Sequence, residues 1–140
     1  MKKLFYVIVL AIIAFAFTGC SKNEMSGSIL GTWEEYRSCR QDFLESHFDD
    51  EIIEQKWRRQ WTFHDDGTCE VFGLSWSHDG TYETEYFTYE ISGNVLTIEE
   101  DLYIIEKLTK KELVITNEMD FYLNSKHYHW KDFEYFNRIK

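Results

Sequence analysis

Short segments in which hydrophobic and polar residues alternate, separated by turn residues, make up the chain after residue 30. In residues 55–64, the side chains of Trp57, Trp61 and Phe63 fall on one face of a two-residue period and polar side chains fall on the other. The β-branched and aromatic content of these alternating segments is typical of β-strands. The segments predicted as strands are 31–39, 55–64, 68–77, 81–91, 95–100, 102–108, 113–123 and 133–139.

Most of these segments are joined by links of hairpin length, so the sequence predicts consecutive antiparallel hairpins. An open sheet of this kind would leave two unpaired edges, and closing the sheet on itself removes them. Eight strands suit a small barrel whose interior holds side chains or one small ligand. We therefore predict an all-β fold, an eight-stranded antiparallel up-and-down barrel.

Two segments do not fit the strand pattern. In residues 41–54, Leu44, Phe48 and Ile52 recur every four residues, which predicts a short helix or a long loop inserted after the first strand. Residues 125–132 are predicted to form an aromatic-rich loop before the last strand. Its side chains His127, Tyr128, His129 and Trp130 would form an exposed patch, and the two imidazoles would share one face if the segment were extended.

The large side chains of the predicted strands are candidates for the inside of the barrel. Either they line a cavity for a small apolar or amphipathic ligand, or they fill the interior and leave no cavity. If the interior is filled, the patch at residues 127–130 would dock another protein. The candidate lining residues are Trp57, Trp61, Phe63, Phe72, Leu74, Trp76, Phe87 and Tyr89.

A His-Asp motif occurs twice, at residues 64–67 and 78–80, and each copy ends in glycine. Asp-Gly between alternating segments indicates a hairpin turn, because glycine accepts the positive φ that the turn needs. The two turns would lie at opposite ends of one strand, some 30 Å apart at ~3.3 Å per residue. They could not share a metal ion, and neither copy has the three or four ligands that zinc needs. We predict turns and no metal site.

The N-terminus has the features of an export signal. Lys2 and Lys3 precede an uncharged apolar run at residues 4–17, which has the length of a signal-peptide core and is shorter than the ~20 residues of a membrane-spanning helix. Thr18-Gly19-Cys20 resembles the bacterial lipobox, which implies cleavage before Cys20 and lipid attachment to it. The alternative is an ordinary signal peptide with Cys20 unmodified. The predicted organisation is a signal peptide (1–19), a lipidated tether (20–28) and a barrel (29–140).

Composition narrows the expected partners. The chain has 140 residues, of which 44% are hydrophobic and 18% aromatic, as expected for one folded domain. Its formal charge of −10 would become −12 without Lys2 and Lys3, which argues against nucleic acid as a partner. The expected location is the bacterial cell envelope, with the outer membrane favoured over the inner, and with the domain facing either the periplasm or the outside.

The sequence offers little catalytic chemistry. No nucleophile, base and stabilising group occur in a recognisable arrangement, so no enzyme activity, catalytic residue or cofactor is expected. Adjacent acids such as Glu34 and Glu35 would point to opposite faces of a strand and are interpreted as solvated surface. Cys39 and Cys69 could form a disulfide, which an exported protein permits, or remain as two buried thiols.

Four motifs, taken in order, resemble the small lipocalin-like domains of Gram-negative lipoproteins. They are the Leu-Gly-x-Trp at 30–33, the Trp-x-Phe-x-x-Asp-Gly-Thr at 61–68, the Tyr-x-Ile-x-Gly-Asn-x-Leu-x-Ile at 89–98 and the paired segments within 103–115. The resemblance implies that Trp33 closes one end of the barrel and that Arg138, from the last strand, packs over its ring. Such a contact is worth roughly 0.5–2 kcal/mol. It also implies a membrane-anchored, non-catalytic binding module.

Overall fold

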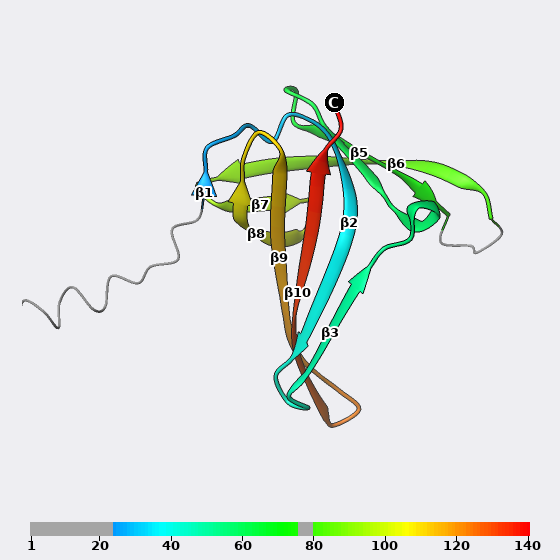
Figure 1. Ribbon diagram of the computed structural model, residues 1–140. Coiled ribbons are helices and arrows are strands. Elements are labelled where there is room, and N and C mark those ends of the chain that lie inside the picture. The colour runs from blue at the N-terminus through cyan, green and yellow to red at the C-terminus, as the bar shows by residue number, and fades with distance from the viewer. Residues whose placement is uncertain (1–23, 76–79) are drawn as a thin grey trace, which may run out of the picture.

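The computed structural model describes residues 24–75 and 80–140, and most of these residues lie in β-strands (Figure 1). Cys20 and the predicted signal peptide lie outside the described residues. In the described ranges, no helix is long and apolar enough to cross a membrane. The elements are β1 (Glu24–Met25), β2 (Gly31–Asp42), β3 (His47–Ile52), the 3-10 helix η1 (Gln55–Trp57), β4 (Gln60–Phe63), β5 (Thr68–Leu74), β6 (Tyr82–Ser92), β7 (Val95–Ile98), β8 (Asp101–Leu108), β9 (Glu112–Leu123) and β10 (Lys126–Arg138).

In the part of the chain that the structure describes, eight strands close into an antiparallel up-and-down barrel. β2 pairs with β4, each strand from β4 to β9 pairs with the next, and β10 returns to β2. Closure pairs both edges of the sheet along the barrel wall. The predicted all-β barrel is confirmed, and it has the strand number and connectivity of the lipocalin architecture.

Three strands of the wall continue beyond the barrel and form an arm (Figure 1). The end of β2 pairs with β3 on one side and with β10 on the other, and β10 pairs with β9. We call the paired residues 37–52 and 117–131 the arm. The helix or loop predicted at 41–54 is wrong, because this segment completes β2 and forms β3, with η1 beginning at Gln55.

The predicted loop at 125–132 is also wrong, since β10 begins at Lys126. Asn124 and Ser125 both have positive φ, 49° and 63°, and link β9 to β10 directly. Positive φ at both central residues defines a two-residue hairpin turn that matches the twist of the strands. Residues 126–131 therefore add six residues of paired strand to the arm.

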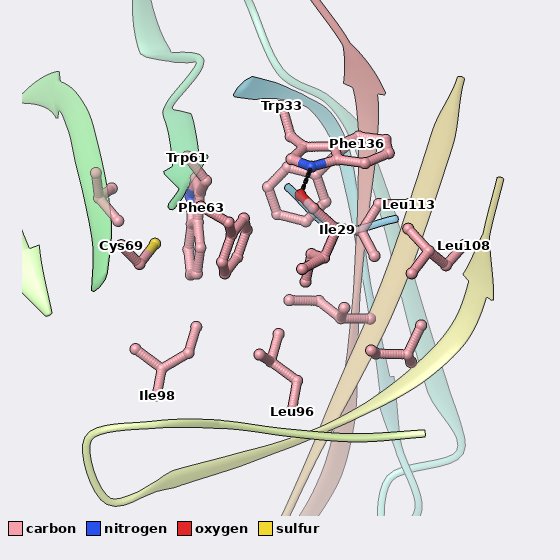
Figure 2. Close-up of a cluster of buried hydrophobic side chains, with 13 residues drawn as sticks. Ile29, Trp33, Trp61, Phe63, Cys69, Leu96, Ile98, Leu108, Leu113 and Phe136 are labelled. Carbon is pink, nitrogen blue, oxygen red and sulfur yellow. Dashed lines mark hydrogen bonds between the residues drawn. The ribbon is translucent and has the colours of Figure 1, made fainter. Parts of the chain in front are cut away.

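The core fills the end of the barrel where β2 begins (Figure 2). Trp33 is fully buried beside Phe136, and its indole Nε1 donates a hydrogen bond to the Ile29 carbonyl at 2.6 Å. Aliphatic side chains from β7, β8 and β9 complete the packing. The buried hydrophobic residues of this core are Ile29, Trp33, Trp61, Phe63, Cys69, Val71, Leu96, Ile98, Ile105, Leu108, Leu113, Ile115 and Phe136.

The first His-Asp motif is a turn, as predicted. Gly67 has a φ of 82°, and the Asp66 carboxylate accepts hydrogen bonds from the Thr68 amide at 2.9 Å and the Thr68 hydroxyl at 2.6 Å. These contacts reverse the chain between β4 and β5. His78 and Asp79 of the second copy lie outside the described residues.

Candidate functional site

A cavity of about 300 Å³ lies inside the barrel, next to the core. Five of its lining residues are apolar or aromatic and come from β4 to β8, and five are charged. The apolar and aromatic residues are Trp61, Val71, Phe87, Ile98 and Tyr103. The charged residues are Arg59, Glu85, Glu99, Asp101 and Glu134. We call this cavity, defined by these ten residues, the cup.

The two-residue period of the strands places these side chains. Cys69 and Val71 are buried on the inner side of β5. Phe72, the next residue after Val71, points outward and is 43% exposed. The register follows from the pairing of Trp61 with Val71 and of Phe63 with Cys69, which puts all four side chains on the inner side. The cup floor is thus continuous with the buried core.

Two carboxyl groups lie where the barrel wall passes into the arm. Glu35 follows Trp33 by two positions on β2, and Glu134 precedes Phe136 by two on β10, so both share the inner face with those buried rings. The prediction that Glu35 is solvated surface is therefore wrong. Both carboxyls also border an adjoining groove of about 490 Å³ along the arm.

Burial raises the pKa of both groups. For Glu134 the pKa rises to about 8, because the carboxyl is desolvated and because Glu35 and Asp132 repel its charge, while Arg59 acts in the opposite direction. For Glu35 the pKa rises to about 7 through burial, and Arg59 again lowers it. Burial and the neighbouring Glu134 also raise the pKa of the Tyr103 hydroxyl to about 12. Near pH 7 the Glu134 carboxyl in the cup is therefore mostly protonated, and the Glu35 carboxyl beside it is about half protonated.

Two polar atoms on residues that line the cup are buried and, among the described residues, have no hydrogen-bond partner. They are the indole nitrogen Nε1 of Trp61 and the carboxyl oxygen Oε2 of Glu134. Buried polar groups are normally paired, and each exception needs an explanation such as an absent ligand or water. These two atoms make the cup the candidate site.

Trp33 and Arg138 meet at the closed end of the barrel. The guanidinium carbon of Arg138 lies 4.2 Å from the centroid of the Trp33 ring system. Its Nη1 donates to the Leu30 carbonyl at 2.6 Å, and Nη2 donates to the carbonyl of Ser28. Gly31 has a φ of 115°, and a β-carbon there would lie 2.6 Å from the Lys140 carbonyl oxygen, so this approach needs glycine.

The predicted lining residues are divided among several places. Trp61 and Phe87 line the cup, Phe63 is in the core, and Tyr89 packs against the core with its hydroxyl donating to the His64 carbonyl at 2.6 Å. Trp57 belongs to η1 and is 51% exposed, so it and the outward Phe72 do not face the interior. Leu74 shares the outward side of β5 with Phe72. Trp76 lies outside the described residues.

Cys39 and Cys69 are both free, so of the two alternatives that the sequence left open, the one with two buried thiols describes this structure. Cys69 lies in the barrel core, where burial raises its pKa to about 12. Cys39 lies in the arm and donates a hydrogen bond to the Asp50 carboxylate at 3.2 Å. Neither thiol is positioned as a reactive nucleophile.

His127 and His129 share one face of the arm, as an extended segment requires. Each imidazole Nε2 pairs with its own carboxylate on β9: His127 with Asp120 at 2.6 Å and His129 with Glu118 at 2.7 Å. Across residues 24–75 and 80–140, no group of three or more His, Cys, Asp and Glu side chains is placed to hold a metal ion. We therefore place the candidate site in the cup.

Comparisons with known proteins give structural likenesses only. No protein-family model matches the sequence, and no curated protein matches it. Three solved structures resemble the fold at 15% identity: apocrustacyanin C1 and C2, each with a TM-score of 0.49, and lobster apocrustacyanin A1, with 0.47. The alignments cover 89%, 89% and 79% of this chain and 66%, 66% and 61% of those chains. The barrel assignment rests on the strand pairing of this chain itself.

Proposed function

We propose that this chain is a membrane-anchored, lipocalin-like lipoprotein whose barrel binds a small apolar or amphipathic ligand without catalysis. The observation that carries the proposal is the cup, a cavity of about 300 Å³ lined in equal number by apolar or aromatic and by charged residues. Small-molecule sites are concave, combine apolar contacts with polar groups that orient the ligand, and start at about this volume. The closed, well-packed opposite end of the barrel supplies the rigid floor that such a site needs.

Filling the cup is expected to abolish binding. Val71 lies on its wall, so Val71→Trp places an indole in the space that a ligand would occupy. We expect the affinity for an uncharged aromatic probe, 1-naphthol, to fall at least about tenfold, because most of the ligand's apolar contact area is lost. The measurement is calorimetric titration of the full chain in nanodiscs of zwitterionic lipid, with protein-free nanodiscs as the blank.

Phe72→Trp is the matched control, because Phe72 is the next residue on β5 and points outward, where it stacks on Tyr82 at 5.6 Å. It introduces the same side chain outside the barrel, so its affinity should stay within about twofold of the unchanged protein. Circular dichroism verifies that both variants fold. Equal affinities for the two folded variants, or no binding of any probe to the unchanged protein, would refute ligand binding in the cup.

The anchor is a separate part of the proposal. Cys20 follows the signal-like segment and precedes the described domain, and several acyl chains give durable membrane attachment where one chain gives marginal attachment. Cys20→Ser is expected to move the protein from the membrane fraction into the soluble fraction of the cell envelope. Ser21→Ala is the control and should leave it in the membrane fraction. Membrane retention of the Cys20→Ser protein would contradict lipidation at this residue.

A second candidate function is docking of another envelope protein through the arm. The observation that favours it is the number of large hydrophobic side chains that the arm exposes, including Phe48 at 57%, Ile52 at 64% and Tyr122 at 73%. Exposed aromatic and aliphatic side chains gathered on one extended element are typical of interaction surfaces. The probe titration separates the two functions, because a barrel that binds nothing leaves the arm as the functional element.

A further inference from the structure

The cup is built with polar groups that the protein itself does not satisfy. Trp61 Nε1 and Glu134 Oε2 are buried, and neither has a hydrogen-bond partner among the described residues. Leaving such a group unpaired costs about 1–3 kcal/mol, and a charged group costs more. Both residues line the same cavity, so one molecule bound there could pair with both.

Several other carboxylates on β2, β8 and β10 are paired, unlike Glu134. Asp132, two residues earlier on β10, accepts from Arg40 Nε at 2.6 Å. Glu34, the neighbour of Glu35, accepts from Arg58 at 3.1 Å, and Glu106 accepts from Lys131 at 3.1 Å. The unpaired oxygen of Glu134 is therefore a feature of the cup and is not shared by these acids.

The charges around the cup are unbalanced. Among the described residues that line it, four carboxyl groups face one guanidinium, that of Arg59. Glu35 adds a fifth carboxyl close to Glu134, and Arg59 already interacts with both of these acids. A bound anion would meet repulsion from several directions in a partly desolvated site, whereas a bound cation would relieve it.

From these observations we propose that the cup selects a small amphipathic cation, a protonated amine with an apolar or aromatic body, whose ammonium group donates a hydrogen bond to Glu134 Oε2. The body would pack against Trp61, Val71 and Phe87. A hydroxyl or carbonyl oxygen on the ligand would accept from Trp61 Nε1. This inference rests on the proposed function and specifies the ligand class for the same cavity.

The test uses three probes that share a phenyl body and differ in charge: 2-phenylethylammonium, 2-phenylethanol and phenylacetate. Each is titrated calorimetrically into the full chain in zwitterionic nanodiscs at pH 8.5, with protein-free nanodiscs as the blank. We expect the ammonium to bind at least about tenfold more tightly than the alcohol, and phenylacetate to bind most weakly, because a charge-assisted hydrogen bond forms only with the ammonium.

Glu134→Gln keeps the size of the side chain and removes its charge. In this variant the preference for ammonium over alcohol should shrink to within about threefold, while the affinity for the alcohol stays within about twofold. Glu90→Gln, which removes the same charge from the exposed outer side of β6, is the control and should keep the full preference.

Each outcome decides between the two proposals. If the alcohol binds as tightly as the ammonium, if phenylacetate is preferred, or if Glu134→Gln keeps the preference, the selectivity for cations is overturned and the binding function stands. If 1-naphthol and all three phenyl probes fail to bind, both proposals fall together.

Discussion

Replacing Trp33 with alanine is expected to destabilise the barrel by about 4 kcal/mol, the range of large aromatic-to-alanine changes in protein cores. Trp33 is fully buried beside Phe136, and its indole Nε1 donates a hydrogen bond to the Ile29 carbonyl at 2.6 Å. The substitution leaves a large cavity, an unpaired buried carbonyl and an Arg138 guanidinium without its ring. Urea unfolding followed by circular dichroism gives the free energy of unfolding.

The control for this prediction is Tyr86→Ala on β6, where the side chain is 73% exposed. Removing an aromatic ring from that position should change the free energy of unfolding by no more than about 0.5 kcal/mol. Arg138→Met tests the contribution of the cation, which should be smaller than that of the indole. If Trp33→Ala and Tyr86→Ala have equal effects, Trp33 does not close the barrel as described.

The free energy of unfolding is expected to fall as the pH rises from about 5 to 9. The folded-state pKa values of Glu35 and Glu134 are about 7 and about 8, above the ordinary value of 4.5. The folded protein therefore holds protons that the unfolded chain releases above pH 4.5, so the stability from these neutral acids is present at pH 5 and is lost as the pH passes their folded values. The expected loss is several kcal/mol, since each pKa unit corresponds to about 1.4 kcal/mol.

Glu134→Gln should flatten this dependence, because glutamine has no proton to lose. At pH 9 the variant is expected to be about 2 kcal/mol more stable than the unchanged protein, and at pH 5 the two should be similar. Urea unfolding at pH 5, 7 and 9 measures the difference. Glu90→Gln should follow the unchanged protein at every pH, and a Glu134→Gln curve parallel to both would mean that Glu134 is ionised throughout.

The alternation of residue types was enough to predict the barrel, because a two-residue period and hairpin turns constrain consecutive strands strongly. It was not enough to predict the arm. Leu44, Phe48 and Ile52 are spaced by four, which fits one face of a helix and also fits one face of a strand, since four is a multiple of two. In the structure Phe48 and Ile52 lie on strand β3 and Leu44 lies in the turn before it, so pairing with β2 decided between the two patterns.

The interior of the cup was predicted only in part, for a similar reason. On β5 the larger residues Phe72 and Leu74 were chosen for the inside, but the smaller Cys69 and Val71 face inward because they pair with Phe63 and Trp61. Side-chain size is a weaker guide to burial than register. The buried acids could have been found from the sequence, since Glu35 lies two positions from Trp33 and thus on the same face.

The continuity of β2 and β10 from the barrel into the arm has a mechanical consequence. Glu35 and Glu134 lie on these two strands at the point where the wall ends. The pairing of β2 with β10 shifts register there, between Tyr135 and Phe136, whereas β10 pairs with β9 in one register from Lys126 at the tip to Asn137 in the wall. A force on the tip of the arm would therefore be transmitted along β9 and β10 to Glu134 beside the cup.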